Sequence, residues 1–151
     1  MTQKPDLEIV VADDDEGHRE LVRRNLRRAG INNPIVALSS GQAVLDYVFR
    51  EGPYASRPAA HLMILLDINM PGGVDGVDVL RRLKADPERR SIPIVMLTTT
   101  DDPREVERCY ALGCNVYMTK PVEPAAFIES VNRLGLFISI VNVPAETPAA
   151  P

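Results

Sequence analysis

Five short, largely apolar runs occur along the chain, and polar or turn-forming residues follow each of them. The runs are Leu7–Ala12, Ile35–Leu38, Leu62–Leu66, Ile92–Leu97 and Asn115–Met118. An apolar run of this length between turn residues is typical of a strand that is buried on both faces, as in a parallel sheet. The third run gives the clearest pattern, because it ends directly in the carboxylate of Asp67, and the turn residues Pro71 and Gly72 follow closely.

Apolar residues between and after these runs recur every three or four positions, which is the spacing of one helix face. Five such segments are marked by Val22, Leu26 and Ala29; by Val44, Leu45, Val48 and Phe49; by Val79, Leu80 and Leu83; by residues 103–113; and by Phe127, Ile128, Val131 and Leu134. Ser39 or Ser40 can cap the second helix, and Pro103 can begin the fourth. Strands and helices that alternate with short links predict a doubly wound, flavodoxin-like α/β fold, with a five-stranded parallel sheet in the order 2-1-3-4-5 and five helices.

The 151 residues suit one domain, which we expect over residues 1–135. Residues 136–151 read as an apolar extension followed by an Ala- and Pro-rich tail, and we expect no output domain there. The apolar stretch 136–143 either folds back over its own domain or forms a contact between two copies of the chain. We favour the second alternative, a homodimer.

Charge and composition narrow the classes of partner. The formal net charge of -4 gives no basic excess that would attract nucleic acid. The arginines between residues 23 and 28 fit the solvated face of a helix better than a partner contact. The N-terminus lacks the apolar core of a signal peptide and no run approaches membrane-spanning length, so we expect a cytoplasmic protein with no membrane partner. Cys109 and Cys114 are expected to be buried free thiols in a reducing compartment.

Polar side chains follow four of the predicted strands. They are Asp13 and Asp14, Asp67, Thr98, and Lys120. Because functional crevices of α/β sheets lie beyond the carboxyl ends of the strands, these side chains should converge on one edge. Clustered carboxylates repel one another unless a cation neutralises them, and oxygen ligands without a histidine suit Mg2+. A carboxylate can also accept a phosphoryl group, while a metal, an ammonium group and a hydroxyl hold the phosphate oxygens.

The same residues carry a resemblance to a known family. Asp13 with Asp14, the segment Asp67–Pro71, Thr98, and Lys120 with Pro121 together resemble the receiver domain of two-component response regulators, over about residues 7–135. The resemblance implies a signalling protein rather than an enzyme. It would accept a phosphoryl group from a sensor histidine kinase, in a Mg2+-dependent reaction that the receiver itself catalyses, and would signal through protein–protein contacts.

The resemblance also implies a role for each site residue. Asp67 would be the phosphoacceptor, and Asp14 and Asp67 would bind Mg2+ directly. Asp13 would bind the ion through water, and Asn69 through its backbone carbonyl. Thr98 and Lys120 would contact the phosphoryl group. Tyr117 matches the aromatic residue that rotates inward when Thr98 is drawn toward the phosphate, although a half-buried strand residue with a solvated hydroxyl is the alternative.

A narrower similarity is to the stand-alone receivers that partner bacteriophytochrome-type histidine kinases. It rests on the segment near Glu51–Tyr54, on Ile92–Thr99, on Tyr110–Gly113 and on the apolar extension that ends at Val143 and Pro144. It implies a bacteriophytochrome as the phosphodonor and allows a phosphotransfer protein as a further partner in a phosphorelay.

Two other classes of function are weighed against this interpretation. A haloacid-dehalogenase-like phosphatase needs an aspartate two residues after the nucleophile, where this chain has Asn69, and its acidic pair comes last instead of first. A receiver-like binding module that works without phosphate is the stronger rival.

The segment from Pro71 to Gly76 is one residue longer than the usual family spacing, which adds flexible glycine beside the site. His18 is expected to be a solvated surface residue, and Asp15 a helix cap.

Overall fold

Five parallel strands form one sheet in the order β2-β1-β3-β4-β5. The computed structural model describes residues 7–28, 31–120 and 129. Its strands are β1 (Leu7–Ala12), β2 (Ile35–Leu38), β3 (His61–Leu66), β4 (Ile94–Thr98) and β5 (Val116–Thr119). Its helices are α1 (Glu16–Arg28), α2 (Gly41–Phe49), α3 (Gly76–Ala85) and α4 (Pro103–Leu112), with a short 3-10 turn, η1 (Gly52–Tyr54). The predicted fold class and sheet order are confirmed, whereas the predicted fifth helix and the extension over residues 136–151 lie outside the described residues.

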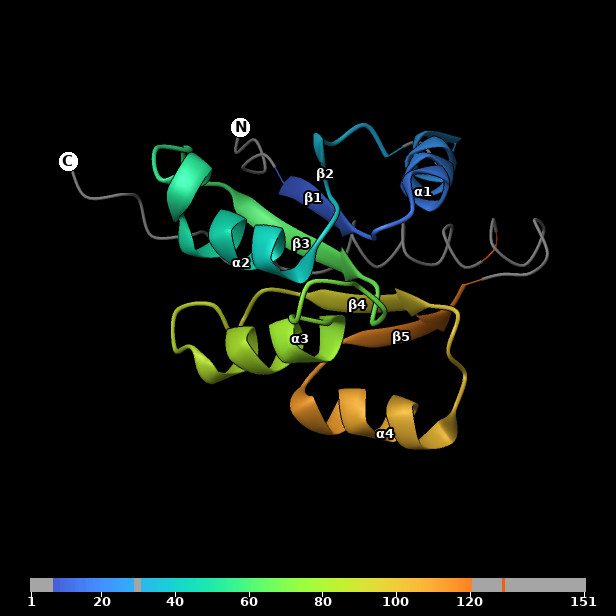
Figure 1. Cartoon of the computed structure of the whole chain (residues 1–151). Helices are drawn as coiled ribbons and strands as arrows, with labels where there is room; N and C mark the ends of the chain where they lie inside the picture. Colours follow the sequence, from blue (N-terminus) through green and yellow to red (C-terminus); the bar gives the residue numbers. More distant parts are fainter. Residues whose placement is uncertain (1–6, 29–30, 121–128, 130–151) are drawn as a thin grey trace, which may run out of the picture.

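Helices cover both faces of the sheet, which is why its strands are apolar on both sides (Figure 1). On one face α2, α3 and α4 pack against a cluster that includes Val10, Ile64 and Met96. On the other face α1 contributes Val22 and Leu26 to a cluster with alternate strand residues. Among the described residues, no helix combines the length and apolar character needed to span a bilayer.

Side-chain caps set the starts of the helices. Asp15 accepts a hydrogen bond from the backbone N–H of His18 (3.0 Å), so α1 begins directly after the acidic residues that follow β1. Ser40 accepts from the N–H of Ala43 (3.1 Å) and caps α2, as one of the two predicted alternatives. The predicted roles of Asp15 and Ser40 as helix caps are thus confirmed.

Three strands begin at a different residue than predicted, and β4 and β5 also end one residue later, at Thr98 and Thr119. β3 begins one residue earlier, at His61, β4 begins at Ile94 instead of Ile92, and β5 begins at Val116 instead of Asn115. The reason for the last two is local hydrogen bonding. Pro93 has no N–H to donate, and the side chain of Asn115 accepts the N–H of Ile94 (2.9 Å), so these residues precede the regular ladder.

Candidate functional site

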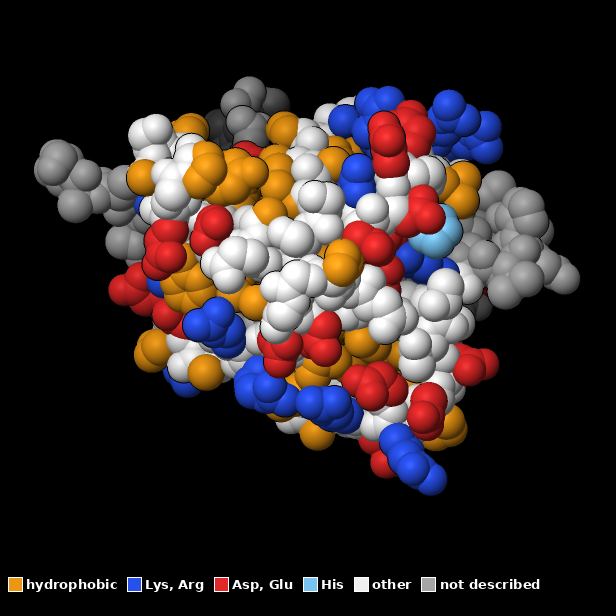
Figure 2. Space-filling model, in the orientation of Figure 1, with side chains coloured by type: hydrophobic (Ala, Val, Ile, Leu, Met, Phe, Trp, Pro, Cys, Tyr) orange, Lys and Arg blue, Asp and Glu red, His pale blue; other side chains and the backbone are white. Residues whose placement is uncertain are grey.

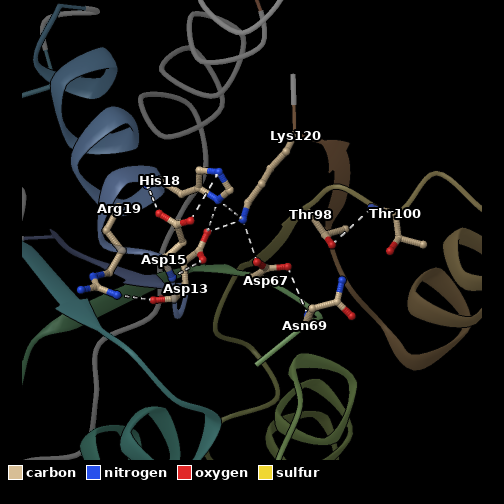
Figure 3. A network of polar contacts seen from close by, with 9 residues as sticks. All are labelled: Asp13, Asp15, His18, Arg19, Asp67, Asn69, Thr98, Thr100 and Lys120. Carbon is tan, nitrogen blue, oxygen red and sulfur yellow. Dashed lines mark hydrogen bonds and ion pairs between the residues drawn. The ribbon is translucent and has the colours of Figure 1, made fainter. Parts of the chain in front are cut away.

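The carboxyl ends of four strands deliver polar side chains to one edge of the sheet (Figure 3). Asp13 follows β1, Asp67 follows β3, Thr98 is the last residue of β4, and Lys120 follows β5. Ala12 and Leu66 are in register, so Asp13 and Asp67 emerge from neighbouring strands at the same level. All four polar residues are buried. The structure therefore brings together the residues that the strand pattern predicted to converge.

Three carboxylates form a compact cluster at this edge. Asp13, Asp14 and Asp67 each offer one oxygen, and these oxygens lie within 4.8 Å of one another. Asp13 and Asp67 are buried, whereas Asp14 is exposed. Backbone N–H groups hold the buried pair in place, because Asp15 donates to Asp13 Oδ1 (2.9 Å) and Asn69 donates to Asp67 Oδ1 (3.2 Å).

Lys120, which follows the edge strand β5, neutralises part of this charge. Its ammonium nitrogen donates to Asp67 Oδ2 (2.7 Å) and to Asp13 Oδ2. Burial by itself lowers the pKa of Lys120, but the hydrogen bonds and charges of the two carboxylates outweigh burial and raise that pKa. The lysine is therefore a permanent positive charge at neutral pH.

Thr98 is fully buried, and the segment after it connects the site to Tyr117. The Thr98 hydroxyl accepts a long hydrogen bond from the N–H of Thr100 (3.5 Å), and the Tyr117 hydroxyl donates to the carbonyl oxygen of Thr100 (2.5 Å). Burial raises the pKa of Tyr117 to about 12, so its hydroxyl keeps the proton that it donates. The backbone N–H of Tyr117 donates to the hydroxyl of Tyr110 on α4 (3.0 Å). Tyr117 is thus bonded both to the segment after Thr98 and to α4.

The donor set at the acidic cluster fits a hard divalent cation such as Mg2+. All its side-chain ligand atoms are carboxylate oxygens, two of the three carboxylates are held by backbone N–H groups, and the third is open to solvent. Oxygen ligands with an open side suit Mg2+, which retains several waters when a protein binds it. The Asn69 side chain is exposed, and its backbone N–H is the group that contacts Asp67.

The lengthened segment after Asp67 is accommodated by close backbone packing. Gly72 and Gly73 have positive φ values of 100° and 88°, which only glycine adopts readily. They turn the chain so that the backbone of Val74 lies against Gly41, the first residue of α2, where a Cβ would overlap the Val74 carbonyl. Gly76 in turn lies against the carbonyl of Asp67. The connection from Asp67 to Gly76 is therefore packed closely against the start of α2 and the end of β3.

His18 is a site residue that the sequence interpretation missed. Its side chain is 45% exposed, but its Nδ1 lies 3.1 Å from Lys120 Nζ and 3.6 Å from Asp13 Oδ2. Figure 2 shows acidic side chains at the surface on the side of the molecule where these strands end. The sequence did contain one indication, since a helix capped by Asp15 must begin its first turn beside the acidic pair.

Comparison with known proteins identifies the family. A model of the response regulator receiver domain matches residues 9–132. The chain therefore belongs to the receiver-domain family of response regulators, proteins of two-component signal transduction, as the motif residues indicated.

Several relatives resemble this chain over most of its length. Response regulator Rcp1 of Synechocystis sp. is 31% identical over 138 residues, covering 91% of this chain and 92% of Rcp1. The crystal structure of a response regulator receiver domain from Rhodospirillum rubrum has 44% identity and a TM-score of 0.81, and the match covers 93% of this chain and 99% of that chain. The structure of the bacteriophytochrome response regulator AtBRR has 34% identity and a TM-score of 0.72, covering 89% and 96% of the two chains. The narrower similarity to bacteriophytochrome response regulators is thus confirmed.

Proposed function

We propose that this protein is a phosphorylation switch that accepts a phosphoryl group on Asp67 from a sensor histidine kinase in the cytoplasm. The observation that carries the proposal is the position of Asp67. Its carboxylate is buried at the end of β3, lies 2.7 Å from the Lys120 ammonium group, and belongs to the cluster with Asp13 and Asp14. Family membership supports the same chemistry.

In the proposed reaction, a carboxylate oxygen of Asp67 attacks the phosphorus of a phosphohistidine. The O–P bond forms as the N–P bond breaks, and the bonding electrons return to the imidazole nitrogen of the donor. Lys120 then exchanges one of its carboxylate contacts for a phosphoryl oxygen, and the Thr98 hydroxyl donates to another. Mg2+ held by Asp13, Asp14, Asp67 and the Asn69 carbonyl would neutralise charge on the phosphoryl group. Hydrolysis of the acyl phosphate at the same site resets the protein.

We further propose that Tyr117 transmits the state of the site. If Thr98 is drawn toward a phosphoryl group, the following backbone as far as Thr100 must adjust. Tyr117 follows, because its hydroxyl is bonded to the Thr100 carbonyl and its backbone N–H to Tyr110. The output is then a changed surface over α4 and β5 that another protein recognises.

The partners follow from the same reasoning. Similarity to bacteriophytochrome response regulators supports a bacteriophytochrome-type kinase as the phosphodonor. A phosphotransfer protein that removes the group from Asp67 is compatible with this role. Homodimer formation through residues 136–143 remains a prediction from the sequence.

Phosphorylation by a small donor tests the site directly. Wild-type protein incubated with acetyl phosphate and Mg2+ should gain one acid-stable, base-labile phosphoryl group, detected by intact-protein mass spectrometry. Asp67→Asn should lose the adduct, because an amide is not a nucleophile for this transfer. Asp46→Asn is a matched control, since Asp46 lies on α2 and its carboxylate binds Gln42 instead of the site.

Two results would contradict the proposal. Equal labelling of Asp67→Asn and wild type would show that another group is modified. A wild type that gains no adduct and does not bind beryllofluoride with Mg2+ would favour the phosphate-independent binding module instead.

A further inference from the structure

The contact between His18 and Lys120 joins α1 to the phosphoacceptor site. The two residues are 102 positions apart in the chain, yet His18 Nδ1 lies 3.1 Å from Lys120 Nζ. Figure 3 shows the imidazole on the α1 side of the lysine and Asp67 on the opposite side. Lys120 thus has three neighbours within hydrogen-bond distance, which are His18, Asp13 and Asp67.

The chemistry of the two groups fixes their roles in this contact. An ammonium group has three N–H donors and no acceptor, so Nδ1 of His18 must be the acceptor. In this arrangement Nε2 is the ring nitrogen that bears the hydrogen. Nε2 lies 4.0 Å from Asp15 Oδ2, on the side facing away from the lysine. Each N–H of the ammonium group consequently has its own partner.

An alternative arrangement is a protonated His18 paired with Asp13. The distances favour the lysine contact, because Nδ1 is 3.6 Å from Asp13 Oδ2 and only 3.1 Å from Lys120 Nζ. A protonated imidazole would also place a second positive charge against the ammonium group.

We propose that His18 is a positioning residue that holds the Lys120 ammonium group at the phosphoacceptor site. The lysine side chain has four rotatable bonds and ordering it costs conformational entropy. The two carboxylates hold the nitrogen from the sheet, and His18 holds it from α1. Since Lys120 exchanges a carboxylate contact for a phosphoryl oxygen, the His18 contact is the one that need not change. This inference rests on the proposed function.

Two variants of His18 distinguish the effect of losing the hydrogen-bond acceptor from the effect of changing the size of the side chain. In His18→Asn the amide oxygen is bonded to Cγ, as Nδ1 is in histidine, so an acceptor stays at the same distance along the side chain. His18→Leu keeps a side chain of similar size without an acceptor. We expect the maximum rate of Asp67 labelling by acetyl phosphate with Mg2+ to fall by roughly 2- to 10-fold in His18→Leu, the range for one lost hydrogen bond. His18→Asn should label faster than His18→Leu.

A double-mutant cycle distinguishes positioning from a merely structural effect on α1. In a Lys120→Met background, the difference between His18→Leu and wild-type His18 should disappear, because the group that His18 positions is gone. His61→Leu is the matched control, since His61 is the other histidine of the chain and lies at the opposite end of β3. Nitrogen NMR supplies a readout that does not depend on labelling. The Nδ1 resonance of His18 should shift on Lys120→Met and stay unchanged in His61→Leu.

The outcomes separate this inference from the proposed function. Equal labelling rates for wild type, His18→Leu and His18→Asn would overturn the positioning role, even if Asp67 is the phosphoacceptor. So would a rate loss in His18→Leu that persists unchanged in the Lys120→Met background. If wild type is not labelled at Asp67 at all, the proposed function fails, and an unshifted Nδ1 resonance in Lys120→Met would then also disprove the contact.

Discussion

A single ammonium group balances part of the charge of three neighbouring carboxylates. Lys120 contacts Asp13 and Asp67 directly, and Asp14 lies within the same cluster. When all four groups are ionised, two negative charges remain in excess, which a divalent cation would neutralise. The lysine and a bound divalent cation would therefore share the same carboxylates, and each would weaken the binding of the other.

Replacing Lys120 should strengthen Mg2+ binding while it impairs phosphorylation. Lys120→Met keeps an unbranched side chain of similar length but removes the positive charge that competes for Asp13 and Asp67. The ammonium group and a bound cation would repel one another, and a net loss of repulsion of about 1.4 kcal/mol corresponds to a gain in Mg2+ affinity of about tenfold, which is the size of effect that we expect. Isothermal titration calorimetry with MgCl2 measures it.

A matched lysine gives the control for this experiment. Lys84 on α3 is partly buried, but its ammonium group donates to the carbonyls of Arg90 and Ile92, away from the acidic cluster. Lys84→Met should leave Mg2+ affinity unchanged. An equal affinity in Lys120→Met and wild type would show that the ammonium group and the cation do not compete.

The sequence predicted the residues of this site that follow strands and missed the one on a helix. Asp13, Asp67 and Lys120 each directly follow a strand and Thr98 ends one, and the parallel sheet alone brings them to one edge. His18 reaches the same edge only because of the angle at which α1 leaves Asp15. That angle depends on packing against the sheet, which the spacing of apolar residues does not specify.

The connection between β3 and α3 is held in place by close backbone packing. Gly72 and Gly73 supply left-handed turns, and the turned backbone of Val74 then lies against the first residue of α2. Val74 also packs against the apolar layer beneath α2 and α3. The lengthened connection therefore depends on a glycine at position 41, in a different helix.

Gly41→Ala should destabilise the protein, although the same change usually stabilises a helix. In an isolated helix, alanine is favoured over glycine by about 0.5–1 kcal/mol. Here the new Cβ would overlap the Val74 carbonyl, so we expect the free energy of unfolding to fall by about 1–3 kcal/mol. Urea titration followed by circular dichroism measures it.

Gln42 provides the comparison for this variant. It is the next residue of α2, its side chain is exposed, and it contacts Asp46 on the same helix. Gln42→Ala should change the free energy of unfolding by less than about 0.5 kcal/mol. Unchanged or increased stability of Gly41→Ala would mean that the connection after Asp67 moves freely away from α2.

Strands were easier to predict than their ends. Five apolar runs were sufficient to give the number of strands, and their alternation with helices predicted the order of the sheet. The start of β4 was wrong by two residues, because Ile92 is buried in the apolar layer although it precedes the ladder. The burial of side chains determines which residues are apolar, whereas backbone hydrogen bonds determine where a strand begins. Beside Pro93 the apolar run therefore begins before the strand does.

At the scale of the whole molecule, the apolar layer beneath α2, α3 and α4 contains two buried thiols that can ionise at high pH. Cys109 on α4 and Cys114 before β5 are buried free thiols, as predicted. Burial raises the pKa of each from the ordinary value of 9.0 to about 11. Both lie beside the face through which we propose that Tyr117 signals.

These thiols should make the stability of the protein fall at alkaline pH. In the unfolded chain each thiol loses its proton near pH 9.0, whereas in the folded protein it keeps the proton to about pH 11. Between these values the unfolded state binds fewer protons, so the free energy of unfolding decreases as pH rises, on the order of 1 kcal/mol per pH unit. The contribution of the thiols is fully present below pH 9.0 and is lost by about pH 11. Tyr117 and Lys120, whose pKa values are also raised, act at still higher pH.

Urea unfolding at pH 8, 9 and 10 tests the role of the thiols. The quantity to compare between variants is the slope of the free energy of unfolding against pH, not its absolute value. The double variant Cys109→Ala with Cys114→Ala should be less stable at every pH, because it leaves cavities, but its stability should decline less steeply between pH 9 and 10 than that of wild type. Ile94→Val is the control for the cavity, since it removes a buried methyl group without a titratable one and should keep the wild-type slope. A double variant with the wild-type slope would mean that the thiols are reached by solvent as α4 and β5 move. The apolar layer on that face would then be too open to transmit a rotation of Tyr117 to the surface over α4.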